Sequence, residues 1–147
     1  SPLSLGDQYT LRTWKTVMPY DIVRDDQLGV TRVSFKGTLD RDGFLSGMRE
    51  ARATPGHSYR TLVVVSPDAA VTLSAEDTRE IAVAMRSERS DSAPHGRNAV
   101  IVPSNLAFGL ARMVQSYWQE GPSEIRVFHD EEEGLAWLTS PEASDPA

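Results

Sequence analysis

Three short apolar runs rich in β-branched residues constrain the fold of this chain more than any other feature. They are Thr61–Val65, Asn98–Val102 and Glu124–His129. The first two are apolar at consecutive positions, so a strand built from either presents apolar side chains on both faces. Such strands are typical of parallel sheets covered by helices on both sides. The runs therefore predict buried, neighbouring strands within a layered α/β domain.

Segments with helical spacing separate and follow these runs. Phe44, Leu45 and Met48 give one helix its apolar face, and Thr78, Ile81, Ala82 and Met85 recur at helical spacing in the next. Polar residues suited to cap helices precede each segment, and Pro and Gly follow most of them. The predicted helices run from Arg41 to Ala53 after Asp40, from Ser74 onward, from Ser104 to about Glu120, and from Asp130 to about Leu138.

A hairpin precedes the first helix. Tyr20–Arg24 and Val30–Lys36 read as two strands, and Gly29 between them suits a turn residue with positive φ. The predicted fold class is thus α/β, with a mixed, mostly parallel sheet of four to five strands, an N-terminal antiparallel hairpin and about four helices. We assign the domain to residues 18–139. Residues 1–17 form an extension or an extra edge strand, and residues 140–147 form a polar tail.

Composition narrows the function. The 147 residues suit one domain, and 39% hydrophobic residues provide a core. The chain has no cysteine, which excludes a thiol nucleophile, thiolate zinc ligands and iron–sulfur clusters, and fits a cytoplasmic location. A net charge of −6 disfavours nucleic acid as a partner. No apolar run is long enough to span a bilayer, so we expect no integral membrane segment.

Catalytic motifs are missing from the sequence. There is no HExxH, GxSxG, phosphate-binding loop or dinucleotide-binding glycine pattern, and the three histidines are His57, His95 and His129. The acidic run from Asp130 to Glu133 suits a solvated helix start, favoured by the helix dipole, better than a cation site. We therefore expect a protein that is not an enzyme, with no catalytic residues, no metal and no cofactor.

The carboxyl ends of the parallel strands are where open α/β sheets bind ligands. Asp68, Ser104 and Asn105 follow two of these strands and are candidate contacts to a ligand or partner. Helix N-termini there present unpaired backbone N–H groups suited to an anion. The alternative for Ser104 is simple helix capping. The same alternative is stronger for Ser74, because Asp77 three residues later completes a capping-box pattern.

Phe108 and Arg112 are the other two candidates for ligand or partner binding. If Leu106, Leu110, Met113 and Tyr117 define the buried side of their helix, Phe108 lies on the opposite side with Arg112 one turn later. An aromatic ring beside a cation there can form an interface or line a pocket, or can stack locally. Gly109, inside the same helix, suggests close approach of another backbone.

Two segments of the sequence resemble a known family. The stretch Ala99–Met113, which includes Pro103-Ser104-Asn105-Leu106-Ala107-Phe108-Gly109, and the ending Ile125–Leu138 are similar to the SpoIIAA-like branch of the STAS-like domains. The resemblance covers about residues 19–138. It implies a mixed sheet with helices, related to CRAL-TRIO lipid-transfer domains and to anti-sigma-factor antagonists. Those antagonists carry a phosphorylatable serine in an Asp-Ser-Ser/Ala-Gly pattern, which is missing here, and Ser74 is the nearest position.

The resemblance and the missing catalytic motifs together favour a non-catalytic binding or regulatory domain. Its partner is expected to be a protein, including a second copy in a homodimer, or a small apolar or anionic ligand. The alternative is a carrier of small molecules or lipids, with its pocket at the carboxyl ends of the parallel strands.

Overall fold

The computed structural model describes residues 20–56, 59–88, 96–117 and 123–141. The predicted N-terminal segment 1–17 and most of the predicted tail 140–147 lie outside these ranges. Within them no helix is both long and apolar enough to cross a membrane. The elements are β1 (Tyr20–Asp25), β2 (Val30–Phe35), β3 (Thr38–Leu39), α2 (Arg41–Arg52), β4 (Arg60–Val65), β5 (Ala70–Val71), α3 (Ala75–Ser87), β6 (Gly96–Ile101), α4 (Asn105–Tyr117), β7 (Ser123–Phe128) and α5 (Glu131–Thr139).

A five-stranded sheet in the order β1-β2-β4-β6-β7 forms the centre of the molecule. The hairpin β1–β2 is antiparallel, with Tyr20 opposite Phe35, and Gly29 in its turn has a φ of 69°. The pairs β2–β4, β4–β6 and β6–β7 are all parallel. The predicted α/β class with a mixed, mostly parallel sheet and an N-terminal hairpin is confirmed.

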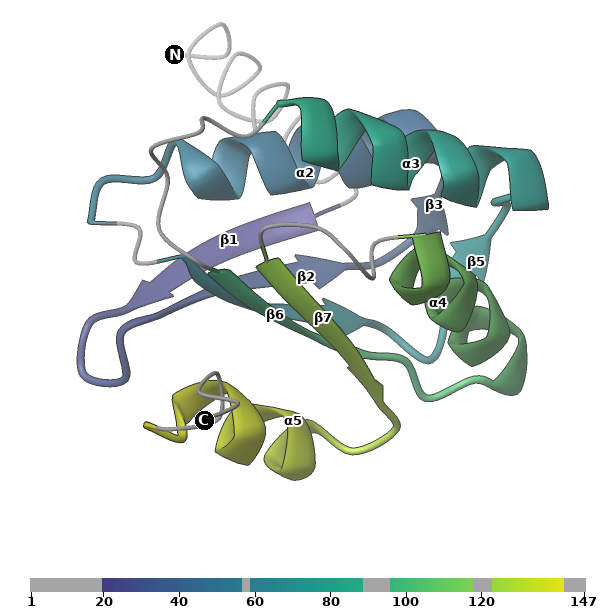
Figure 1. The fold of residues 1–147 in the computed structure, drawn as a ribbon. Helices are drawn as coiled ribbons and strands as arrows, with labels where there is room; N and C mark the ends of the chain where they lie inside the picture. Colours follow the sequence, from purple (N-terminus) through teal and green to yellow (C-terminus); the bar gives the residue numbers. More distant parts are fainter. Residues whose placement is uncertain (1–19, 57–58, 89–95, 118–122, 142–147) are drawn as a thin grey trace, which may run out of the picture.

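Helices cover both faces of this sheet, as Figure 1 shows. Helices α2, α3 and α4 lie on one face, over a core that includes Phe35, Val63 and Ile81. Helix α5 lies on the other face, over Val30, Leu62, Ala99, Ile101 and its own Leu138. Strand β4 therefore buries Leu62 on one side and Val63 on the other, at 1% and 0% exposure. This two-sided burial is the physical reason why the sequence of β4 is apolar at consecutive positions.

A second, two-stranded sheet was not predicted. Strand β3 pairs in parallel with β5, which lies between Val65 and the start of α3, where the sequence predicts no strand. The amide of Ala70 donates to Gly37 O at 2.7 Å, and the amide of Thr72 donates to Leu39 O at 3.0 Å. Strands of two residues carry no readable alternation, so only the tertiary arrangement reveals them.

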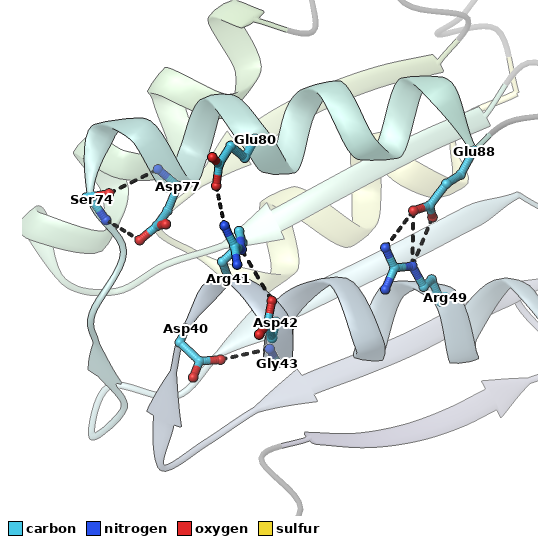
Figure 2. A network of polar contacts seen from close by, with 9 residues as sticks. All are labelled: Asp40, Arg41, Asp42, Gly43, Arg49, Ser74, Asp77, Glu80 and Glu88. Carbon is cyan, nitrogen blue, oxygen red and sulfur yellow. Dashed lines mark hydrogen bonds and ion pairs between the residues drawn. The ribbon is translucent and has the colours of Figure 1, made fainter.

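Ion pairs join α2 and α3 across their exposed sides (Figure 2). Arg41 at the start of α2 pairs with Glu80 of α3, and Arg49 and Arg52 near its end both reach Glu88, at 2.6 and 2.7 Å. The hydrogen bonds from Arg49 hold the pKa of Glu88 below its ordinary value. These pairs fix the two helices side by side over the sheet.

Two arginines of the sheet hold the ends of α5. Arg97 is 3% exposed, and its Nη1 donates to the carbonyl oxygens of Trp137, Leu138 and Ser140, the last at 2.6 Å. Backbone carbonyls at a helix C-terminus have no partner within the helix and attract a cation. At the other end, Arg32 makes a two-pronged ion pair with Glu131 at 2.6 and 3.0 Å. Within the described ranges α5 is the one helix on this face, and it is anchored at both ends.

Helix α2 packs tightly against an aromatic cluster at the hairpin. The rings of Phe35 and Phe44 stack with centroids 5.2 Å apart, and Tyr20 meets Phe35 edge-on at 6.0 Å. A Cβ added to Gly47 would lie 2.8 Å from the Phe35 ring. Because Phe35 is held between two other rings, it cannot move away from a larger side chain, and this position of α2 accommodates only glycine.

Gly47→Ala tests this close packing. We expect overpacking, which costs about 1–3 kcal/mol, to outweigh the gain of about 1 kcal/mol in helix propensity, so the variant unfolds at lower urea concentration. Gly109→Ala is the matched control, since nothing in the described chain lies within 4 Å of a Cβ there. That variant should be stabilised by up to about 1 kcal/mol. Equal effects of the two substitutions would contradict the packing argument.

The Arg32–Glu131 pair predicts a pH dependence. The hydrogen bond from Arg32 holds the pKa of Glu131 below its ordinary value of 4.5. A carboxyl group with a lowered pKa in the folded state adds stability above the unfolded value, and this is lost as the pH falls through the folded value. The side chains are 37% and 42% exposed, so solvent limits the contribution to about 1 kcal/mol.

Urea unfolding of Glu131→Gln and the unchanged protein, followed from about pH 7 down to pH 3, measures this contribution. Above pH 5 we expect the free energy of unfolding of the unchanged protein to exceed that of Glu131→Gln. This difference should shrink below pH 4.5, and high salt should reduce it. Glu133→Gln, on the same exposed helix turn, should show no comparable dependence. A difference that stays constant over the whole range would show that Glu131 acts only through packing.

Candidate functional site

The carboxyl ends of the parallel strands meet at one edge of the sheet, where four helices begin. Helix α4 follows β6 and α5 follows β7, and α2 and α3 follow the short strands β3 and β5. This edge, which we call the rim, holds all the predicted site residues. The positions of the helix starts follow from the strand–helix alternation of the sequence.

Ser104 immediately precedes α4 and Asn105 opens it, and both residues are exposed. The carbonyl oxygen of Ser104 accepts the amide of Phe108 at 2.9 Å, which is the bond that opens the helix. Asn105 is the first residue of α4. Both residues therefore lie at the rim, as predicted. Their role in contacting a ligand stays a prediction.

Phe108 faces the protein interior, and the prediction that it lies opposite the buried side of α4 is wrong. Phe108, Ala111 and Val114 pack against the main core. The ring of Phe108 stacks on His129 with centroids 4.0 Å apart and planes 12° apart, and the Arg112 guanidinium lies 6.0 Å from the Phe108 centroid. Apolar residues surround this helix on most sides, so periodicity alone does not define which side is buried.

His129 links the stack to the sheet. Its Nδ1 lies 3.1 Å from the carbonyl oxygen of Val102 at the end of β6. A carbonyl oxygen only accepts, so Nδ1 carries the proton and the ring is fixed in orientation. Phe108, His129 and Arg112 thus form a column at the rim, of which Arg112 and His129 are exposed. We call this group the rim stack.

Two predicted residues stand apart from the rim stack. Asp68 is exposed in the turn after β4, where its amide donates to Ser66 Oγ at 3.2 Å. Ser74 caps α3 in the predicted capping box (Figure 2): its Oγ accepts from the Asp77 amide at 3.0 Å, and its own amide donates to Asp77 at 2.9 Å. This second bond lowers the pKa of Asp77. Phosphorylation of Ser74 stays a prediction.

Two further predictions concern the cap of α5 and the packing around Gly109. Asp130 caps α5 as predicted, and its side chain accepts from the amide of Glu132. Gly109 is exposed, and in the described chain nothing lies within 4 Å of a Cβ built there. The expected close approach of another backbone at Gly109 is therefore wrong.

An apolar cavity of about 50 Å³ lies between the sheet and helices α2, α3 and α4. Its floor is formed by inward-facing side chains of β4 and β6, among them Val63, Val65 and Val100. Met48, Met85 and Ala111 face it from the three helices. Leu39 and Val71 of the two-stranded sheet, together with Leu73, close the end near the rim.

One polar side chain, Asn98, lines the cavity among the described residues. Its Nδ2 donates to the backbone oxygen of Glu124 at 3.3 Å. No Asp, Glu, Lys, Arg or His from the described ranges lines the cavity. The described residues also contain no group of three His, Asp or Glu side chains placed to hold a metal ion. Two of the three histidines, His57 and His95, lie outside those ranges.

Comparison with known proteins identifies the fold. A crystal structure of an uncharacterized DUF3478-family protein from Shewanella loihica PV-4, which has a SpoIIAA-like fold, is similar to this chain with a TM-score of 0.51. The alignment covers 81% of this chain and 91% of the other, at 18% identity. The chain has a SpoIIAA-like fold. No protein-family model and no curated protein matches the sequence.

The SpoIIAA-like fold brings together only part of what the sequence predicted. It brings His129, for which the sequence predicts no role, beside Phe108 and Arg112 of α4. It also builds a cavity around Asn98, which was predicted only as the first residue of a strand. A polar residue that opens an apolar β-branched run, at an inward-facing position, is the sequence signal for Asn98.

Proposed function

We propose that this protein is a non-catalytic binding domain that takes a small apolar ligand into the cavity between the sheet and helices α2, α3 and α4. The observation that supports this most is the almost wholly apolar lining, with Asn98 as its one polar side chain among the described residues. Small-molecule sites in proteins are typically concave, apolar and equipped with few polar groups. The proposal is the carrier alternative of the sequence analysis, with the site moved from the rim into the interior.

The size of the cavity limits the ligand. Roughly 10–15 Å³ of such volume holds one water-sized group, so about 50 Å³ accommodates a molecule of roughly four non-hydrogen atoms. Protein interiors are otherwise close-packed, and an empty cavity costs about 24 cal/mol per Å³. A ligand that fills this space adds packing contacts that the lining otherwise lacks.

The charge of the ligand follows from the lining. Burying an ion without a partner costs far more than one hydrogen bond returns. Because the described lining contains no charged side chain, a ligand enclosed there is uncharged. The anionic ligand considered from the sequence does not suit this cavity and would have to bind at the rim.

Filling the cavity tests the proposal. Ala111 lines it from α4, and Ala111→Leu adds carbon atoms into the space where the ligand would lie. We expect the variant to fold and to lose at least tenfold in affinity for isobutene, a small apolar probe, measured from methyl shifts in ¹H–¹³C NMR spectra. Ser116→Leu, on the exposed side of the same helix, is the matched control and should bind as before.

Two results would contradict the proposal. One is that the unchanged protein shows no saturable shifts with isobutene. The other is that the Ala111→Leu variant binds isobutene as well as the Ser116→Leu control does.

A second candidate function is self-association through the rim stack. Arg112 is exposed beside an aromatic pair, and aromatic and arginine side chains are enriched at interfaces. A chain of net charge −6 offers acidic partners for an exposed arginine on a second copy. This supports the homodimer considered from the sequence.

Charge reversal tests self-association. If the rim stack forms a dimer, Arg112→Glu should shift sedimentation-velocity profiles toward the monomer, because like charges then meet at the interface. Arg79→Glu, an exposed substitution on α3, is the control and should leave the profile unchanged. A monomer for the unchanged protein at high micromolar concentration would remove this candidate.

A further inference from the structure

The two-stranded sheet separates the cavity from solvent at the rim. Leu39 of β3, Val71 of β5 and the neighbouring Leu73 all line the cavity. Val71 and Leu73 are half-buried, so the side chains that close the cavity here also reach water. We call residues 67–73, which contain β5, the flap. The flap is therefore a single layer of chain between the cavity and solvent.

A short ladder of backbone hydrogen bonds holds the flap to β3. The amide of Ala70 donates to Gly37 O at 2.7 Å, and the amide of Thr72 donates to Leu39 O at 3.0 Å. Both donor residues are exposed, and the described part of β5 has close backbone neighbours in β3 and hardly any in other elements. Sparse contacts and exposed backbone hydrogen bonds mark the segments of a protein that open at the lowest free energy.

The chain on either side of the flap is fixed. Before it, the amide of Ser66 donates to Phe35 O at 2.9 Å and so continues the pairing of the five-stranded sheet. After it, Ser74 caps α3 in the capping box. Strand β3 is fixed as well, because Leu39 is 3% exposed and Asp40 beside it caps α2. The flap is thus the part of this closure that can move without disturbing the large sheet or the helices.

We infer that the flap is the gate of the cavity: β5 separates from β3, and a small apolar molecule passes between Leu39 and the displaced Val71. This inference rests on the proposed function, since it requires that the cavity binds a ligand. Opening takes Val71 and Leu73 away from their apolar neighbours, so the closed state is the resting one. A lid of this kind sets the rates at which a ligand enters and leaves, while the closed site sets the affinity.

Hydrogen exchange of the unchanged protein tests the gate without a ligand. After correction for intrinsic rates, the amides of Ala70 and Thr72 should exchange at least about tenfold faster than that of Val102. The Val102 amide is the matched control, because it donates to Phe128 O at 2.9 Å at the same edge of the large sheet. Equal protection of the three amides would show that β5 does not separate from β3, and would overturn the inference.

A reversible disulfide tests the passage of a ligand. Thr38 and Ala70 are register partners of β3 and β5, and both are exposed. Neighbouring strands are close enough for a disulfide, and the chain has no cysteine of its own. Combining Thr38→Cys with Ala70→Cys therefore gives one defined bond that joins the flap to β3. The same protein in its reduced form is the matched control.

In the oxidised variant, the rates at which isobutene binds and leaves should both fall at least about tenfold, with an unchanged dissociation constant. NMR exchange spectroscopy measures these rates, and the reduced variant should match the unchanged protein. Equal rates in the oxidised and reduced forms would show that the ligand enters elsewhere, and the inference then fails alone. If isobutene shows no saturable binding to the unchanged protein, the proposed function fails and takes the inference with it.

Discussion

The pairing of β4 with β6 at the centre of the sheet is the interaction on which the rest of this structure depends. Leu62 and Ala99 point to one side and Val63 to the other, each at 1% exposure or less, so β4 is buried on both faces and β6 is buried on the side of α5. Parallel strands need long crossover connections, and those connections supply the helices that cover them. Both layers of helices are therefore needed to exclude water from these strands. Each layer in turn packs against the β4–β6 pair.

The two layers are attached by different physical means. On one face, α2 and α3 are joined by ion pairs at their exposed sides, and α2 rests on the aromatic cluster around Phe35. On the other face, α5 is the one helix among the residues that the structure describes, and Arg97 and Arg32 hold its two ends. A buried arginine that bonds helix-end carbonyls satisfies groups that water would otherwise have to reach. The α5 layer is therefore specified by polar contacts as much as by its small apolar face.

The cavity arises where three helices share one face. Helices α2, α3 and α4 pack against the sheet and, in part, each other, and β3 and β5 close the end at the rim. The same helix α4 lines the cavity with Ala111 and Val114 and carries Phe108 in the rim stack. The interior site and the rim surface thus depend on the placement of one helix, which connects the two candidate functions physically.

Much of the candidate site could not be read from the residues in advance. The rim position of Ser104 and Asn105 followed from the strand–helix order, because every such connection brings a helix start to the same edge. The side of α4 that faces inward did not follow, since Phe108, Leu110 and Ala111 are all apolar and the helix can be rotated without a change in pattern. The cavity was equally hidden, because a volume left between elements is a property of their packing and of no single segment.

The sequence by itself determined the hairpin, the buried strands, the capped starts of α2 and α3 at Asp40 and Ser74, and hence the fold class. These features depend on local preferences and on alternation along the chain, which a single segment carries within itself. Only the tertiary structure decided the rotation of α4, the pairing of β3 with β5, the burial of Arg97 and the apolar cavity under the three helices. Each of these depends on contacts between residues that are distant in the chain. Packing and hydrogen bonding there select among arrangements that the local sequence does not distinguish.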